Sequence, residues 1–374
     1  MSWVLAISGF AALVVLHEGG HFLAAKAVGM RVEKFFLFFP PKIASITRGE
    51  TEYGIGAIPL GGYVKITGMN PEEEIPPEVA HRAYYRQPVW KRIVVISAGP
   101  LVNIVLALVM FFGLAVGFGV DTRPTNTIES TGEDLPAAQV LQAGDQLVSV
   151  DGKRVDDLKG LALINTVRKQ VGTHTCKGEP VDGCEATSPV ELGVIRDGEE
   201  RSLSVTPVFD APEAAPGAPE IEPRMVVGFG YEFKRDRLSV TEGAEFAVDR
   251  LWLVTSRTAE VFAGIFNAEQ REQITGVVGA TEVTRQSFEF DTRQALIVLA
   301  VISLSLGLIN LLPFLPLDGG HIFWALIEKL RGRPVPLRVM ERSGLIGFAL
   351  VLILFFIGLQ NDIGRLTGEG FNVR

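Results

Sequence analysis

The chain has 374 residues, of which 47% are hydrophobic and only 21% are charged, with a formal net charge of -8. The apolar residues are clustered: uncharged runs of 28, 24 and 19 residues lie at 93–120, 294–317 and 343–361, and the first 25 residues carry a single charge, Glu18. About 20 apolar residues span the hydrocarbon core of a bilayer. These four runs exclude a soluble enzyme, a disordered protein and a nucleic-acid-binding protein.

The first expected transmembrane helix covers residues 1–25. It is not a cleavable signal peptide, because it lacks a basic segment at its start and carries polar residues inside the apolar stretch. These residues are His17, Glu18 and His21. A charged group within a bilayer span costs roughly 2–3 kcal/mol, so a functional role is the default interpretation.

Residues 26–92 carry ten Lys and Arg residues, which places them on the cytoplasmic side by the positive-inside rule. Short β-type runs broken by glycine, as in 54–66, predict hairpins. Their apolar character predicts that they dip into the membrane, where irregular backbone must be covered by protein or line a water-filled cavity. The second expected transmembrane helix covers 93–119.

Residues 121–226 are predicted to form one exported α+β domain. We expect a strand at Leu147–Val150, a helix at Leu158–Val171, a hairpin that turns at Asp197-Gly198, and a linker rich in Pro, Ala and Glu at 210–223. The chain's two cysteines, Cys176 and Cys184, also lie here. Outside the cell a disulfide between them is permitted, and two reduced thiols in a flexible loop are the alternative.

The rest of the chain completes a polytopic α-helical membrane protein with four transmembrane helices. Charge again sets its orientation, because five basic residues between 329 and 342 place that loop in the cytoplasm and both termini outside. The expected segments are an extracytoplasmic amphipathic helical region at 227–294 that could lie on the outer membrane surface, a third span at 295–325, a cytoplasmic loop at 326–342, a fourth span at 343–361 and an extracytoplasmic tail at 362–374.

The first span contains the pattern His-Glu-x-x-His at residues 17–21. Residues four apart share one face of a helix, so His17 and His21 can reach a single metal ion. Glu18 projects beside that ion, where a general base acting on water would stand. Zinc suits two imidazoles and one carboxylate, with a fourth position left for water.

The third ligand is expected at the end of the third span. Asp318 is the only acid near that membrane end, and the first and third spans run in the same direction, so it can meet the two histidines near the cytoplasmic leaflet. Pro313 and Pro316 interrupt the helix before it. Asp318 could instead cap the following helix, which is compatible with ligation, and His321 is expected to pack nearby rather than to ligate.

These residues resemble the site-2 protease family of intramembrane zinc metalloproteases, and within it the bacterial regulator-of-sigma-E type. The segment 135–152 is similar to the PDZ domains that such enzymes carry outside the cell. The other matching segments are His-Glu-Gly-Gly-His at 17–21, Gly-Gly-Tyr-Val-Lys at 61–65, Ala-Gly-Pro-Leu-Val-Asn at 98–103, and the Asn-Leu-Leu-Pro and Leu-Asp-Gly-Gly-His sequences within 310–321.

The resemblance implies one Zn2+ per chain and a set of site residues. The substrate would become extended and add as a strand to a sheet edge, because a helical peptide bond is shielded from attack. The implied roles are zinc ligation by His17, His21 and Asp318, general-base catalysis by Glu18, contact with substrate backbone by Asn103 and Asn310, and a membrane-dipping β-edge at Gly61, Gly62 and Tyr63.

The resemblance also implies a setting. Substrates would be single-span proteins of the bacterial inner membrane, such as anti-sigma factors and signal-peptide remnants, trimmed first by an upstream site-1 protease; no nucleic acid is involved. The best-known bacterial members carry two PDZ domains, whereas 121–226 has room for one, which could bind peptides or exclude bulky substrates sterically. Residues 276–279, Gly-Val-Val-Gly, also depart from a Gly-Pro-Val-Gly-like segment of the family.

Three alternatives stay open at this point. The chain could be a non-catalytic receptor or scaffold that binds extracytoplasmic peptides through its PDZ-like domain. It could be a zinc transporter, although its polar groups cluster at one membrane depth instead of forming a pathway. The His, Glu and Asp residues could also be a polar cluster that joins helices.

Overall fold

The computed structural model describes the chain except for residues 71–72, 133–134, 212–222, 266, 369 and 372–374, so most of the predicted linker at 210–223 lies outside the described residues. The chain divides into two compact units, Met1–Phe118 with Ser239–Arg374, and Gly119–Leu238. The predicted 121–226 domain is therefore extended to Leu238. The cause is β10 (Phe229–Asp236), which pairs with β3 (Val120–Thr131) in one sheet.

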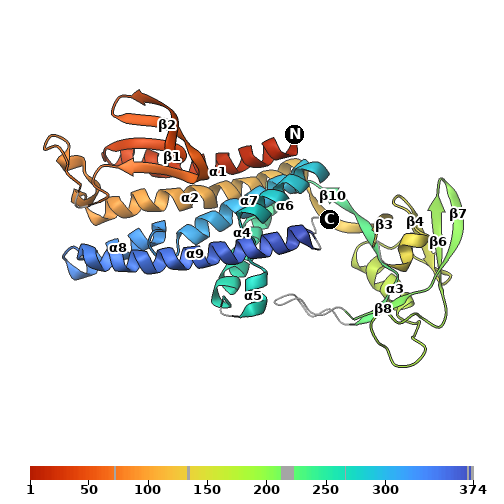
Figure 1. The fold of residues 1–374 in the computed structure, drawn as a ribbon. Helices are drawn as coiled ribbons and strands as arrows, with labels where there is room; N and C mark the ends of the chain where they lie inside the picture. Colours follow the sequence, from red (N-terminus) through yellow and green to blue (C-terminus); the bar gives the residue numbers. More distant parts are fainter. Residues whose placement is uncertain (71–72, 133–134, 212–222, 266, 369, 372–374) are drawn as a thin grey trace. The chain divides into compact units, whose positions relative to one another are not determined.

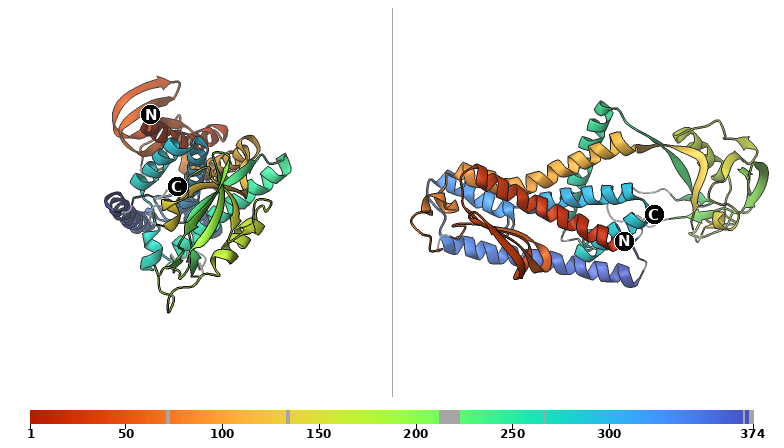
Figure 2. Two further views of the ribbon diagram at one scale, coloured as in Figure 1. Left: turned by 90° about the vertical axis from the view of Figure 1, so that its right-hand side faces the viewer. Right: turned by 90° about the horizontal axis from the view of Figure 1, so that it is seen from above.

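Among its described residues, the first unit contains four helices long and apolar enough to cross a membrane. Figures 1 and 2 show these four helices lying roughly along one common axis. A π-helical turn, η3 (Leu114–Phe118), extends the second of them. The four helices are α1 (Ser2–Ala27), α2 (Val89–Gly113), α7 (Thr292–Asn310) and α9 (Leu337–Thr367).

Two boundaries differ from the sequence prediction. The third span does not continue to residue 325: α7 ends at Asn310, and an irregular stretch follows. A separate helix, α8 (Asp318–Arg331), then covers the end of the predicted span and the start of the predicted 326–342 loop. Proline lacks an N–H and clashes with the preceding turn, so Pro313 and Pro316 end the helix. The fourth helix begins earlier, at Leu337, and ends at Thr367, so it also includes the first part of the predicted 362–374 tail.

The β region is one bent pair of strands, β1 (Val32–Arg48) and β2 (Thr51–Ile66), rather than several short hairpins. One row across it runs Tyr63, Phe36, Gly54 and Ser45, so the two strands form a sheet four segments wide. Tyr63 and its neighbours occupy an outer segment of that sheet. Both strands contact α1.

Three further helices belong to this unit: α4 (Val240–Ala263), α5 (Ala268–Glu272) and α6 (Val277–Phe290). The amphipathic helix α4 begins with a capping box at Ser239 and Glu242 and packs its small residues Gly243 and Ala247 against the α2 and α7 region. Part of its apolar face is thus covered by protein, whereas Trp252 remains 72% exposed.

A buried carboxylate joins α9 to the start of α6. Asp362 is fully buried and accepts hydrogen bonds from the N–H groups of Gly276 (3.0 Å) and Gly279 (2.7 Å). A Cβ at either glycine would lie within 2.6 Å of an Asp362 oxygen. The Gly-Val-Val-Gly segment therefore needs its two glycines for this contact, and the valine that replaces proline does not prevent it.

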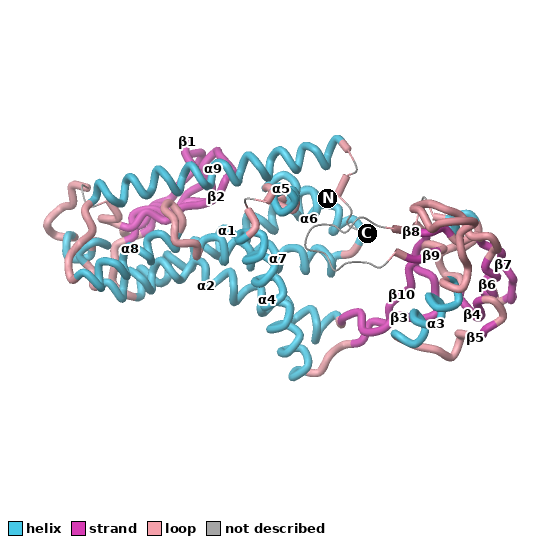
Figure 3. Tube along the Cα trace, turned by 90° about the horizontal axis from the view of Figure 1, so that it is seen from below, coloured by secondary structure: helices cyan, strands magenta, loops and turns pink. Residues whose placement is uncertain are grey.

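The second unit is α+β. Its larger sheet, whose strands are labelled in Figure 3, has the order β10-β3-β4-β6-β7. Its core includes Leu147, Val150, Leu163 and Leu192. The predicted strand, helix and hairpin are present as β4, α3 and β6–β7. The remaining elements of this unit, apart from β3 and β10, are β4 (Gln146–Val150), β5 (Lys153–Arg154), α3 (Leu161–Val171), β6 (Val190–Arg196), β7 (Glu199–Val205), β8 (Val208–Asp210) and β9 (Arg224–Val226).

Two cross-links hold loops of this unit. Cys176 and Cys184 are joined as a disulfide, with their Cα atoms 6.0 Å apart. Arg196 of β6 donates to both carboxylate oxygens of the buried Asp145, at 2.7 and 2.6 Å, and this contact holds the pKa of the carboxyl below its ordinary value. The ion pair fixes the turn before β4 to the next strand of the sheet.

Candidate metal centre

Helix α1 brings its two histidines to a close crossing with α2. His17 and His21 are both buried, and small residues allow the helices to approach. A Cβ at Gly20 would lie 2.6 Å from the Ala98 carbonyl oxygen, and a Cβ at Gly99 would lie 2.2 Å from His21 Nε2. Side chains at these two positions would displace either the helix or the imidazole.

The backbone of α2 fixes the protonation of one imidazole. His21 Nδ1 lies 2.9 Å from the Val95 carbonyl oxygen. Because a carbonyl oxygen only accepts, Nδ1 carries the proton and donates it, so Nε2 of the neutral ring keeps its lone pair. A second partner of this kind is typical of metal-binding histidines.

Asp318, the first residue of α8, meets both rings. Its Oδ2 lies 3.3 Å from His17 Nε2 and 3.2 Å from His21 Nε2, and the two Nε2 atoms are 3.4 Å apart. The loop before α8 packs tightly to achieve this, because a Cβ at Gly319 would lie 2.2 Å from the Leu311 carbonyl oxygen. Sequence positions 17, 21 and 318 thus converge, as predicted.

The triangle of ligand atoms fits a zinc ion. Ligand atoms about 2.0–2.1 Å from one tetrahedral ion lie roughly 3.3–3.4 Å from each other. The three observed separations, from 3.2 to 3.4 Å, match this edge. No group among the described residues donates a hydrogen bond to Asp318 Oδ2, so a cation is the partner that this group of acceptors suits.

The sequence matches Peptidase family M50 over residues 5–354, nearly its whole length. The chain belongs to peptidase family M50. This membership makes it a metalloprotease of the site-2 type and confirms the predicted enzyme class.

Named relatives agree with that membership. Zinc metalloprotease Rip1 of Mycolicibacterium smegmatis is 32% identical, with 94% of this chain and 92% of the relative covered. A putative zinc metalloprotease of Nostoc sp. is 31% identical over 99% and 98% of the two chains. Rip1 of Mycobacterium tuberculosis is 32% identical over 85% and 83%. The predicted cofactor, Zn2+, agrees with these names.

Glu18 of this M50 peptidase stands beside the ligands rather than among them. The metal-binding group in the described residues contains His17, His21 and Asp318 without Glu18. A Cβ on Gly62 would lie 2.9 Å from Glu18 Cγ, so the outer β2 segment passes directly over this side chain. Glu18 therefore lies between the metal position and a strand of the β sheet.

The other predicted site residues are Asn103, Asn310 and the β-edge at Gly61, Gly62 and Tyr63. Asn103 of α2 is fully buried, and neither polar atom of its side chain has a hydrogen-bond partner in the structure. Asn310 is the last residue of α7. Tyr63 stacks on Phe36 and Phe39, at centroid distances of 5.4 and 6.0 Å. Among the described residues, no hydrogen bond joins either asparagine to the three ligands.

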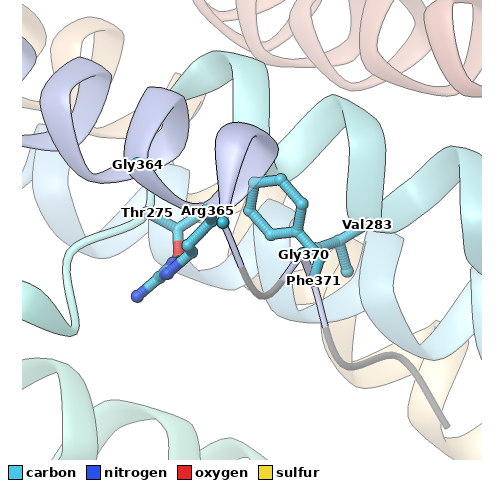
Figure 4. A pocket seen from close by; sticks show the side chains of 7 residues that line it. Thr275, Val283, Gly364, Arg365, Gly370 and Phe371 are labelled. Carbon is cyan, nitrogen blue, oxygen red and sulfur yellow. The ribbon is translucent and has the colours of Figure 1, made fainter.

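A cavity of about 610 Å³ lies elsewhere in this M50 peptidase. Figure 4 shows it near the end of α9, with Thr275, Arg365 and Phe371 among its lining residues. It contains none of the predicted site residues, so it is not the space in which the ligand triangle acts.

Sequence reasoning missed two residues that support the site. The Val95 carbonyl sets the His21 tautomer, and Gly99 leaves room for the ring. A backbone acceptor leaves no mark in a sequence. Gly99 did carry a signal, since it lies in the Ala-Gly-Pro-Leu-Val-Asn segment, but its role emerges only when α1 and α2 are packed.

Proposed function

We propose that this chain is an intramembrane zinc endopeptidase of the regulator-of-sigma-E type. It hydrolyses peptide bonds within or near the transmembrane segments of single-span proteins. The observation that carries the proposal is the ligand triangle of His17, His21 and Asp318, with Glu18 placed between it and the β2 strand. A polar cluster that only joined helices would not require Glu18 to face a strand.

The reaction follows from the chemistry of these side chains. His17, His21 and Asp318 would hold the ion, and Zn2+ supplies Lewis acidity that makes amide hydrolysis accessible at neutral pH. The Glu18 carboxylate takes a proton from the attacking water and returns it to the leaving amine. The fixed His21 tautomer keeps a lone pair directed at the ion, so the ligand set does not have to reorganise.

Substrate positioning falls to the β sheet and the two asparagines. An unwound substrate segment exposes N–H and C=O groups that must be paired inside a membrane. The outer segment at Gly61, Gly62 and Tyr63 offers a backbone edge beside Glu18, and strand addition would pair those groups. Asn103 and Asn310 are proposed to bind substrate backbone; the unpartnered amide of Asn103 supports this role.

The setting is part of the same proposal. The basic segments at 26–92 and 329–342 face the cytoplasm, and the unit Gly119–Leu238 and both termini lie outside the inner membrane. This unit acts as a single PDZ-like domain, and exclusion of bulky substrates is favoured over peptide binding. Anti-sigma factors and signal-peptide remnants, trimmed by an upstream protease, are the proposed substrates.

The Glu18→Gln variant tests the function. It should retain one Zn2+ per chain and lose at least about a hundredfold in the rate of cleavage of a single-span reporter, because general-base catalysis contributes that much. The assay uses purified protein in detergent, with chelator as a second arm and Glu260→Gln, an exposed position on α4, as the matched control. Cleavage by Glu18→Gln at the wild-type rate would contradict Glu18 as the general base, whereas absence of cleavage by the wild-type protein would favour the alternative of a non-catalytic receptor or scaffold.

A further inference from the structure

The end of α8, the start of α9 and the connection between them carry a set of basic side chains without partners among the described residues. All five are exposed, and none has an ion pair or hydrogen bond within the described parts of the chain. They are Lys329, Arg331, Arg333, Arg338 and Arg342. We call this group the connector cluster.

Basic residues in the β region behave differently. Lys26 and Arg82 both bind Glu50, at 2.6 Å each, and Lys65 binds Glu33 and Glu73 at 2.8 and 2.6 Å. Half of the ten Lys and Arg residues of that region form ion pairs with its own acids: Lys26, Arg31, Lys42, Lys65 and Arg82. In the connector cluster, by contrast, none of the five basic side chains has an acidic partner among the described residues.

Acids of the connector do not neutralise the cluster. Glu328 is engaged by the buried Arg92 of α2, with two hydrogen bonds of 3.0 and 2.5 Å. Glu341 is the only other acid between 328 and 342. Arg338 also lies in the first turn of α9, where the helix dipole disfavours a cation and favours an anion. The cluster thus presents an uncompensated positive charge.

The connector is an ordered element with apolar side chains between its charges. Gly332 ends α8 in a left-handed conformation, with its N–H donating to the Glu328 carbonyl oxygen at 2.9 Å, and Val335 is buried. Leu330, between Lys329 and Arg331, is 83% exposed. Exposed cations that alternate with exposed apolar side chains suit a membrane surface, where headgroups and acyl chains meet.

We infer that the connector cluster binds the headgroups of anionic phospholipids. α8 is a single helix that begins at Asp318 and ends at Arg331, so a lipid at its end would hold the helix that supplies the third metal ligand. Arg92 holds the same end from the protein side through Glu328. The inference rests on the proposed membrane orientation and not on proteolysis.

The test measures binding of short-chain phosphatidylglycerol to the full-length Glu18→Gln protein in detergent, with phosphatidylcholine as the neutral lipid. Phosphatidylglycerol should bind more tightly, with an affinity that falls as salt rises. Each basic residue at an anionic surface contributes roughly fivefold in affinity, so Arg331→Gln/Arg333→Gln/Arg338→Gln should lose on the order of a hundredfold. Replacement of the same three by Lys should retain most of the binding.

A matched control removes three exposed lysines of the other unit, as Lys153→Gln/Lys159→Gln/Lys169→Gln, and should bind as the parent does. Zinc content and thermal unfolding of each variant verify that it is folded. Three results would overturn the inference: equal binding of the two lipids, wild-type affinity in Arg331→Gln/Arg333→Gln/Arg338→Gln, or loss of binding in the variant that carries Lys at those three positions. If polyglutamate displaces phosphatidylglycerol at a concentration lower than the one at which the lipid itself binds, the cluster is assigned to an acidic protein instead.

Discussion

At the scale of single residues, the site depends on positions where a side chain has no room. Gly99 is the sharpest of these, because its Cβ would lie 2.2 Å from the Nε2 atom that faces the metal position. The neighbouring Val95 carbonyl binds the opposite side of the same ring. The imidazole of His21 is therefore fixed on one side by its hydrogen bond to the Val95 carbonyl and on the other by the close approach of Gly99. Loss of the hydrogen bond, or a side chain at position 99, would move the ring.

Gly99→Ala should lose zinc and activity while the protein stays folded. The added methyl group displaces His21 Nε2, and we expect at least about a tenfold loss of metal affinity, as for other disturbed supporting groups of metal sites. Competition with a chelator, followed by zinc analysis, measures this loss. Gly113→Ala, at the end of the same helix with no atom within 4 Å of the new Cβ, is the control and should bind zinc normally. Equal zinc affinity in both variants would refute the packing argument.

At the scale of elements, the sequence predicted most of the helices and strands but not how the chain turns between them. Runs with one charge or none identified the four candidate membrane spans among the described residues, since their length is set by the bilayer. The break at Pro313 was expected, yet the separate helix from Asp318 to Arg331 was assigned partly to a span and partly to a loop. The α8 sequence mixes apolar and charged residues, so hydropathy alone cannot delimit it.

The pairing of strands far apart in the chain could not be predicted from the sequence either. Phe229–Asp236 completes the sheet of the second unit by pairing with β3, although about 100 residues separate the strands along the chain. The metal ligands could be predicted from the sequence, because the spacing of His17 and His21 defines a helix face and Asp318 was the only acid at the expected depth. The hydrogen bond from His21 to the Val95 carbonyl could not be predicted, because every residue has a backbone carbonyl and the sequence does not mark this one.

Asp362→Asn should destabilise the first unit by about 1–3 kcal/mol. The carboxylate accepts two N–H groups at the start of α6, and an amide would turn one acceptor into a donor facing a donor. Thermal unfolding in detergent, followed by circular dichroism, measures the change. Asp249→Asn at an exposed position of α4 provides the control. An unchanged unfolding temperature for Asp362→Asn would show that this contact contributes little.

At the scale of the whole molecule, a hydrolytic centre has to be assembled from segments far apart in the chain. The first helix supplies two ligands and Glu18, the second supplies the carbonyl that orients one ligand, and α8 supplies the third ligand. The β sheet then covers Glu18 from its other side. Membership of peptidase family M50 spans this entire arrangement, since the matched residues run from 5 to 354.

The most direct measurement is X-ray absorption spectroscopy of the zinc-loaded protein, combined with zinc analysis of Asp318→Ala. We expect one Zn2+ per chain with two imidazole nitrogens and carboxylate oxygen at about 2.0–2.2 Å, and a large loss of zinc in the variant. A zinc shell without two imidazoles, or full zinc content in Asp318→Ala, would contradict the assignment of His17, His21 and Asp318 as the metal centre.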